Sequence, residues 1–162
     1  MRQIRSYRPG DAEALGKVFH RSIRDGAVGA YGRAAVEAWS PAAPKGDAWE
    51  RRLERADTVL AEENGTILGF MTMRSDTGLL DLAFVLPEAV RSGVASALYA
   101  VLEGRARARG LSHLTTEASL LTEPFFARLG WRVVQRQRVE RRGVLLENCR
   151  MEKRLSKGRA AA

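Results

Sequence analysis

The stretch from Leu79 to Gly110 constrains this chain more than any other segment, because it carries three structural signals in a fixed order. An apolar run of strand formers covers 79–85, and Pro87 ends it, since proline has no N–H to donate to a sheet. Gly93 then precedes an apolar stripe with the 3.6-residue spacing of a helix, and Gly110 is a natural stop. The segment predicts a strand, a small-residue turn and a long helix.

A turn of this kind in front of a helix is a candidate anion site. Unpaired backbone N–H groups and the positive end of the helix macrodipole face whatever lies above it. Gly93 and Ala95 would let a phosphate approach the backbone closely. An ordinary connection between a strand and a helix can contain the same residues, however. On its own, the turn leaves two interpretations open, a pyrophosphate cradle and a plain connection.

Alternation of apolar and polar residues predicts further strands on both sides of this segment. The Asn64-Gly65 pair is the strongest hairpin signal, because a type I′ turn needs positive φ at both positions. The strand after the long helix should return parallel to the central strand through a right-handed crossover. The expected strands cover 3–7, 58–63, 66–73, 79–85, 114–118, 132–139 and 144–153. The shorter expected helices begin after an N-cap at Asp11, follow Asp47, or cover 33–39 and 123–129.

Length and charge limit the classes of protein to consider. With 162 residues the chain should form one domain over 1–155, followed by a basic tail over 156–162 that is expected to be disordered. The net charge of +8 could attract nucleic acid, anionic lipid or a polyanionic cofactor. The basic residues are spread along the chain without interleaved aromatic residues, which argues against a nucleic-acid platform.

Three further absences are informative. The single cysteine, Cys149, permits no intrachain disulfide and suits a reducing cytoplasm. No stretch approaches membrane-spanning length, so we expect a cytoplasmic protein without a membrane partner. The two histidines, His20 and His113, have no metal-binding spacing, so no metal site is expected.

The central segment resembles the GNAT acyltransferase superfamily, in which Arg/Gln-x-x-Gly-x-Gly/Ala follows a strand that ends near a proline. Gly93 and Ala95 match the small positions of this motif. Val90 stands in place of the first Arg or Gln, with Arg91 one position later. Because backbone amides do most of the phosphate binding, this departure weakens the match without removing it.

A second motif of the superfamily, Asn-x-x-Ala-x-x-x-Tyr-x-x-x-Gly-Phe, follows its fifth strand. Its spacing is kept here by Ser119, Thr122, Phe126, Gly130 and Trp131, although the Asn and the Tyr are replaced. This half and the opening IRSYRPGDAEALGKVFHRSI resemble one branch, the bacterial YafP-like acetyltransferases. The resemblance covers nearly the whole chain and implies an α/β (α+β) single-domain GNAT fold, with a mixed, mostly antiparallel central sheet flanked by helices.

The resemblance implies an N-acetyltransferase with acetyl-CoA, or a close acyl-CoA, as donor and a primary amine as acceptor. In the family the central strand splays from its parallel neighbour, and amides near Phe84 and Val85 would bind the pantetheine arm there. A backbone N–H at this edge can also polarise the thioester carbonyl. The pyrophosphate would lie on the turn, and the implied cofactor-binding residues are Phe84, Val85, Arg91, Ser92, Gly93, Val94, Ala95, Ser96, Ser119 and Phe126.

An amine acceptor must lose a proton, because an alkylammonium has a pKa near ~10.4. Glu117 should share a strand face with Thr115 and Ser119, and an acid in a central strand is costly unless it is solvated or paired. We therefore expect Glu117 to act as the base or to bind the amine, with Asp81 as the second choice. The alternative for both is a salt bridge on the sheet with a neighbouring arginine.

The tyrosine that usually protonates the departing thiolate in the family is missing, since Phe126 cannot donate. A thiol pKa of about 8.5 makes the thiolate a tolerable leaving group without an acid. Tyr99 is a poor replacement, because its helix position lies off the apolar stripe, and Tyr31 cannot be placed. Tyr31 and Trp39 could line an acceptor pocket or fill the core.

Two rival functions remain, a non-catalytic acyl-CoA-binding sensor and a basic nucleic-acid-binding module. The replaced Tyr and Asn motivate the first, and the positive charge motivates the second. The sequence leaves open whether the acceptor is a small amine or a protein amine. It also leaves the oligomeric state open, a homodimer included.

Overall fold

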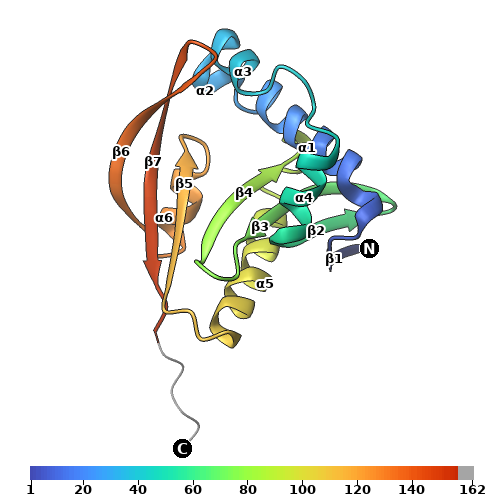
Figure 1. The fold of residues 1–162 in the computed structure, drawn as a ribbon, viewed down its shortest axis with the longest axis vertical. Coiled ribbons are helices and arrows are strands. Elements are labelled where there is room, and N and C mark those ends of the chain that lie inside the picture. The colour runs from blue at the N-terminus through green and yellow to red at the C-terminus, as the bar shows by residue number, and fades with distance from the viewer. Residues whose placement is uncertain (157–162) are drawn as a thin grey trace, which may run out of the picture.

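A seven-stranded sheet in the order β1-β2-β3-β4-β5-β7-β6 runs through the computed structural model, which describes residues 1–156 (Figure 1). β4 and β5 pair in parallel, and the other neighbouring strands pair antiparallel. The strands are β1 (Arg2–Ser6), β2 (Asp57–Glu63), β3 (Thr66–Met73), β4 (Leu79–Val85), β5 (His113–Ser119), β6 (Arg132–Arg141) and β7 (Val144–Arg154). The α/β fold with a mixed, mostly antiparallel sheet is confirmed.

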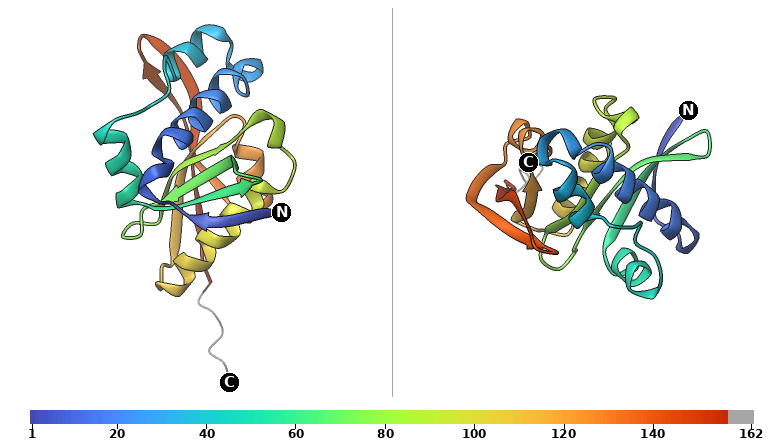
Figure 2. Two further views of the ribbon diagram at one scale, coloured as in Figure 1. Left: turned by 90° about the vertical axis from the view of Figure 1, so that its right-hand side faces the viewer. Right: turned by 90° about the horizontal axis from the view of Figure 1, so that it is seen from above.

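Helices cover both faces of this sheet (Figure 2). They are α1 (Ala12–Arg24), α2 (Val28–Tyr31), α3 (Arg33–Trp39), α4 (Asp47–Arg55), α5 (Val94–Ala108) and α6 (Glu123–Arg128), with short 3-10 helices at Pro9–Asp11 and Pro87–Ala89. Because side chains alternate along a strand, neighbouring residues of β4 show which helix covers which face of the sheet. Phe84 on β4 packs edge-on against Phe19 of α1, with ring centroids 4.6 Å apart. Gly69 and Val85 instead meet Val94 at the start of α5, on the opposite face.

The parallel pair formed by β4 and β5 is short. It joins Leu79 to Thr115 and Leu80 to Thr116, and the two strands then diverge, as Figure 1 shows. A bulge at this point shifts the register of β4 against β3, so that Leu80 pairs with Met73 but Leu82 pairs with Thr72. Because a bulge bends its strand, β4 turns away from β5 and leaves a gap between them.

Most of the expected elements form within one or two residues of their predicted ends. The helices 33–39 and 94 onward and the strands 66–73 and 79–85 begin where the patterns place them. The short helix α2 has no sequence signal, because four residues are too few for a periodic pattern. Leu155 is buried at the end of the domain. The predicted basic tail covers 156–162, and its residues 157–162 lie outside the described part of the chain.

Two sequence expectations about side chains are wrong. The sequence pattern places Tyr99 off the apolar face of its helix, but this residue is only 3% exposed. Its hydroxyl donates to Glu103 at 2.7 Å and accepts from the indole of Trp131 at 3.0 Å, so a polar group is buried with its partners. Asp11 precedes α1 without capping it, because its carboxylate accepts from the Arg8 N–H and pairs with Arg5.

Candidate active site

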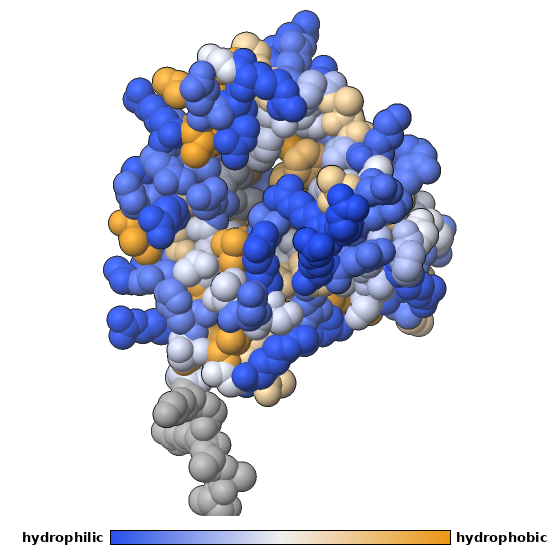
Figure 3. Space-filling view, viewed as in Figure 1, coloured by the Kyte–Doolittle hydropathy of each residue, from blue (hydrophilic) through white to orange (hydrophobic). Residues whose placement is uncertain are grey.

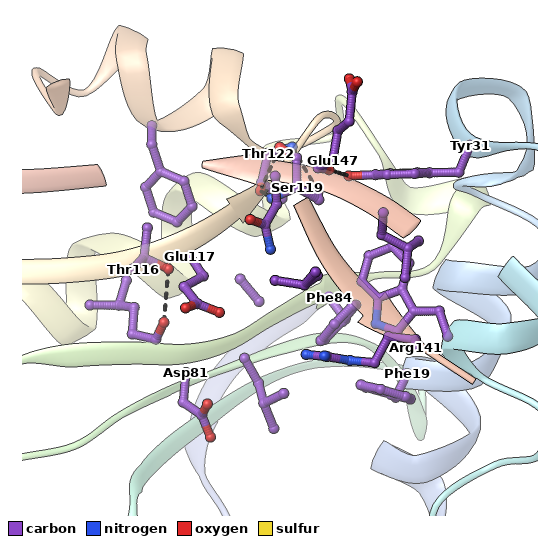
Figure 4. Close-up of a pocket in the computed structure, with 18 of the residues that line it drawn as sticks. Phe19, Tyr31, Asp81, Phe84, Thr116, Glu117, Ser119, Thr122, Arg141 and Glu147 are labelled. Atoms are coloured by element: carbon purple, nitrogen blue, oxygen red, sulfur yellow. Dashed lines mark hydrogen bonds between the residues drawn. The ribbon is translucent and has the colours of Figure 1, made fainter. Parts of the chain in front are cut away.

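The gap between β4 and β5 is part of a cavity of about 430 Å³, which opens to the surface between polar side chains (Figures 3 and 4). α1, α2 and α3 supply an aromatic wall, β4 and β5 form the floor, and the β6–β7 hairpin closes the far side. The aromatic lining residues are Phe19, Tyr31, Trp39, Phe84 and Phe126, and the charged ones are Arg52, Asp81, Glu117, Arg141, Arg142 and Glu147.

Beyond the bulge, β4 presents free backbone groups to this gap. The N–H groups of Leu82 and Leu86 donate to β3 and its flank, to Thr72 Oγ1 at 3.0 Å and to the Leu68 carbonyl at 2.8 Å. Because N–H direction alternates along a strand, the amides of Ala83 and Val85 face the gap. The Val85 carbonyl, which accepts from the Ser22 hydroxyl at 2.9 Å, points away from β3 as well.

The direction of the N–H groups on β4 changes the expectation that the amides near both Phe84 and Val85 face the gap. Val85 offers its amide to the gap as predicted, but the amide of Phe84 faces β3, with which Phe84 pairs at Phe70. The residue that joins Val85 is therefore Ala83. The alternation on β4 restarts at the bulge, and no sequence pattern reveals the bulge. Phe84 contributes its ring to the cavity wall instead.

The predicted anion turn has the required backbone. Gly93 precedes α5 with φ of +88°, in the left-handed region, and no side chain caps the helix. A Cβ at Gly93 would find only Arg2 Nη1 nearby, at 3.9 Å, so the backbone conformation rather than crowding requires glycine. Arg91, Ser92 and Ser96 are exposed, while buried Val94 anchors the first helical turn in the core. The first amides of α5 thus lie open at the surface.

Arg2 on β1 is a neighbour of this turn that the sequence did not indicate. Its Nη1 donates to the Ser92 carbonyl at 2.9 Å. Its Nε is buried and has no hydrogen-bond partner within residues 1–156. Ninety positions separate Arg2 from Ser92 in the chain, so only the packing of β1 beside α5 brings a guanidinium to the turn.

Glu117 lies on β5 as the alternation predicts. Leu114, Thr116 and Ala118 are buried on one face, and Glu117 is exposed on the other, where it lines the cavity (Figure 4). Arg150 is its cross-strand neighbour on β7, yet no ion pair or hydrogen bond within residues 1–156 involves the Glu117 carboxylate. The alternative salt bridge is not formed, and the carboxylate is free to meet a ligand.

Asp81 also lines the cavity, but its carboxylate is engaged. Both of its oxygens accept from Arg52, at 2.9 and 3.0 Å, and this pair joins α4 to β4. Asp81 thus forms an ion pair at the cavity rim, whereas the Glu117 carboxylate has no such partner within residues 1–156.

Tyr31 and Trp39 line the cavity and also pack against buried residues. Their rings lie 5.5 Å apart and pack against the small buried cluster of Ile23, Ala27 and Val36. The Tyr31 hydroxyl has both a hydrogen-bond donor and an acceptor as partners, and burial raises the pKa of this phenol.

The second motif forms the end of β5 and the start of α6. The hydroxyl of Thr122 accepts from the Ser119 N–H at 3.0 Å, and the hydroxyl of Ser119 accepts from the Thr122 N–H at 3.2 Å. Phe126 borders the cavity but is only 1% exposed, with its ring 4.8 Å from that of Trp131. Tyr99, in contact with the same aromatic group, has a raised pKa because it is buried and bonded to Glu103.

The β6–β7 hairpin adds six cavity residues that sequence reasoning missed, and the polar ones are Arg141, Arg142, Glu147 and Asn148. Asn148 lies opposite Ser119 across the β5–β7 pair, and its Oδ1 is buried without a partner in the described part of the chain. Nothing in the local pattern of a hairpin predicts which other segment its tip will cover.

Metal-binding clusters and membrane spans are both absent from the part of the chain that the structure describes. Within residues 1–156, no three histidine, cysteine, aspartate or glutamate side chains are grouped so that they could hold a metal ion. In the same range, none of the helices is both long and apolar enough to span a membrane.

Comparison with known proteins agrees with this geometry. Residues 27–155 match the family model described as the acetyltransferase (GNAT) domain. The chain is 36% identical to the uncharacterized N-acetyltransferase YafP of Escherichia coli (strain K12) over 146 residues, which cover 90% of this chain and 91% of YafP.

Solved structures give the same result. A GCN5-related N-acetyltransferase from Rhodopseudomonas palustris, also named "Aminotransferase, Class-II", has a TM-score of 0.88 and 33% identity, covering 94% of this chain and 95% of its own. The PaiA N-acetyltransferase from Thermoplasma acidophilum, in complex with coenzyme A, shares the fold with a TM-score of 0.73 and 18% identity, covering 96% and 99% of the two chains. With the diverging strands, the open turn before α5 and these matches taken together, the chain belongs to the GNAT family of N-acetyltransferases.

Proposed function

We propose that this protein transfers the acetyl group of acetyl-CoA to a primary amine by direct attack. The observation that carries the proposal is the divergence of β4 from β5, which turns the amides of Ala83 and Val85 toward a cavity. The open turn at Gly93 belongs to the same β4–α5 segment. A thioester arm and a pyrophosphate need these two features, a free strand edge and an anion site at a helix start.

Acetyl-CoA is the donor that these features fit. The amides of 91–96 would hold the pyrophosphate, and Arg2 adds a positive charge beside them. The pantetheine amides would pair with the free edge of β4, and Ser119 and Phe126 would border the far end of the arm. The coenzyme A in complex with the Thermoplasma protein supports this choice of donor.

The amine needs a proton acceptor before it can attack. Glu117 is the candidate base, because its carboxylate lines the cavity without a partner while that of Asp81 is held by Arg52. The neutral amine nitrogen then forms a C–N bond to the thioester carbonyl carbon. A backbone N–H of β4 that faces the gap, from Ala83 or Val85, stabilises the negative charge that develops on the carbonyl oxygen.

The C–S bond breaks in the second half of the reaction, the electron pair leaves on the sulfur, and the acylated nitrogen gives its remaining extra proton to solvent. The tyrosines at 31 and 99 use their hydroxyl groups in internal hydrogen bonds, so neither is a free proton donor. With a thiol pKa of about 8.5, the thiolate can depart unprotonated near neutral pH. The products are the N-acetylated amine and CoA. The proposed location of the reaction is the cytoplasm.

The test joins a binding measurement to a turnover measurement. Calorimetry should show acetyl-CoA binding, and a thiol assay should show release of CoA that depends on an added amine, with mass spectrometry identifying an N-acetyl product. Acetyl-CoA binding without turnover of any amine would favour the acyl-CoA sensor instead. Failure to bind acetyl-CoA would overturn the proposal as a whole.

A further inference from the structure

We infer that the acceptor is a small zwitterion, an amine that also bears an oxyanion such as a carboxylate or phosphonate. Arg141 binds the oxyanion, and Glu117 receives the amine. This inference rests on the proposed function and names its substrate class. The charges that face the cavity and the contacts that close it both support this class of acceptor.

Three of the six charged side chains that line the cavity already have an ion-pair partner. Arg52 and Asp81 form a bidentate pair at 2.9 and 3.0 Å, so neither needs a ligand. Glu147 lies 3.7 Å from Arg138, on the same hairpin. The three cavity residues Arg52, Asp81 and Glu147 are therefore each paired with an opposite charge and give no reason for the cavity to attract an ion.

Three charges remain in the cavity without an ion-pair partner within residues 1–156, the positive charges of Arg141 and Arg142 and the negative charge of Glu117. The only hydrogen bond of the Arg141 guanidinium there is from Nη1 to the carbonyl of Glu140, at 3.2 Å, so most of its donors are free. Figure 4 shows this guanidinium directed into the cavity, toward the side from which Glu117 projects. Arg142, fixed to the Ala38 carbonyl at 2.7 Å, adds positive charge at the same end.

This arrangement selects against a bare cationic amine. An alkylammonium that approached Glu117 would also meet the positive end of the cavity, and like charges in a site with restricted water repel strongly. A zwitterion matches both ends, because its ammonium faces a carboxylate and its oxyanion faces a guanidinium. Arginine is suited to this role, since its planar fork binds carboxylate and phosphonate oxygens two at a time.

The walls between the two charges indicate the rest of the acceptor. Phe19 and Phe84 pack edge to face with centroids 4.6 Å apart, and Trp39 lies 6.3 Å from Phe84. An apolar body is therefore favoured over a strongly hydrated one. Contacts from Tyr31 to Glu147 and from Arg142 to Ala38 tie α2 and α3 to the hairpin across the cavity, which favours a small molecule over a protein segment.

The experiment compares acceptors that differ only in the anion. The panel contains L-amino acids, each with its amide and its decarboxylated amine, for example phenylalanine, phenylalaninamide and phenethylamine. 1-Amino-2-phenylethylphosphonate distinguishes a phosphonate from a carboxylate. The readout is kcat/KM for CoA release with the wild-type protein, and we expect at least one anion-bearing acceptor to exceed its relatives that lack the anion by about tenfold or more.

Arg141→Ala should reduce this preference for the anion by about 10- to 100-fold, while the acetyl-CoA affinity measured by calorimetry stays the same. Arg154→Ala is the matched control, because it removes an exposed positive charge from the same hairpin, at a position that does not line the cavity, and it should keep the preference. Turnover of amines with no preference for the anion, or equal loss in both variants, would overturn the inference alone. Absence of turnover with every amine would overturn the proposed function and this inference with it.

Discussion

The hydroxyl of Tyr31 donates a hydrogen bond to the backbone carbonyl of Glu147 at 2.6 Å. The same oxygen accepts the N–H of Leu120 at 2.9 Å. One phenol thus joins α2 to β7 and to the loop after β5, across the gap in which β4 and β5 diverge. A short helix without a periodic sequence pattern is held in place by this contact and by its packing on Trp39.

Removing this hydroxyl should weaken the fold and the acceptor site together. Tyr31→Phe removes two hydrogen bonds and leaves the Glu147 carbonyl and the Leu120 N–H, which belong to exposed residues, to water. The cost is therefore that of ordinary hydrogen bonds, about 0.5–1.5 kcal/mol. We expect the free energy of unfolding in urea to fall by that amount, and KM for the acceptor to rise more than KM for acetyl-CoA. Tyr7→Phe is the control, because the Tyr7 hydroxyl makes only a long contact, 3.4 Å to the Pro9 carbonyl. Equal stability of the two variants would contradict the assignment.

The turn before α5 allows a second prediction with an internal control. Gly93 and Gly110 flank the same helix, with φ of +88° and +76°, and neither has an obstacle within ordinary contact of a new Cβ. A valine at either position should therefore cost similar stability, roughly 1–3 kcal/mol of backbone strain. Only Gly93→Val should also weaken acetyl-CoA binding, because its side chain would occupy the space above the open amides.

Calorimetry on both folded variants decides between the two interpretations of the turn. If Gly93→Val binds acetyl-CoA as Gly110→Val does, the turn is an ordinary connection between β4 and α5. If neither variant folds, Gly93→Ala with Gly110→Ala repeats the comparison at a lower conformational cost, since alanine tolerates a positive φ better than a β-branched residue.

Much of the fold could be predicted from local pattern, because its signals are local. The Asn64-Gly65 turn adopts positive φ at both positions, and the hairpin between β2 and β3 follows from it. The alternation of β5 places Glu117 on the open face opposite its buried neighbours. Such features depend on residues a few positions apart, so periodicity and turn chemistry determine them.

The rest of the site depends on contacts between distant segments. The bulge at Asp81 decides that Ala83 rather than Phe84 offers an amide, and it arises from the pairing of β4 with β3. Arg52 reaches Asp81 from α4, and Arg141 reaches the cavity from a hairpin tip. The sequence alone does not predict these contacts, because within its own segment each of these arginines has the pattern of a solvent-exposed side chain.

Proton transfer at Glu117 gives a third prediction. Glu117→Gln keeps the shape of the side chain but removes the proton acceptor, so kcat should fall by roughly 10²- to 10⁴-fold. The affinity for acetyl-CoA should not change, because the residue lies on the acceptor side of the cavity. Asp81→Asn serves for comparison and should act mainly through loss of its pair with Arg52, with a smaller effect on kcat. Near-normal turnover by Glu117→Gln would exclude this residue as the base.

The last prediction concerns the buried thiol of Cys149. Burial, together with the hydrogen bond that its Sγ donates to Glu123 at 3.1 Å, raises the pKa of Cys149 to about 11. Because the folded-state pKa is raised, the thiol form stabilises the protein fully below the ordinary thiol pKa, and this contribution is lost as the pH rises through about 11. At pH 8 the thiolate fraction should be about 100-fold below that of an ordinary exposed cysteine.

Reaction with a thiol reagent measures this directly. The native protein should react slowly at pH 8 and rapidly once it is unfolded in urea. Glu123→Gln removes the carboxylate that disfavours the thiolate, so its native protein should react faster than the wild type. Glu140→Gln, which changes an exposed acid on the same hairpin, should not. If the native thiol reacts as quickly as the unfolded one, the bond to Glu123 does not control its ionisation, and Cys149 would become a residue to test for a role at the neighbouring cavity.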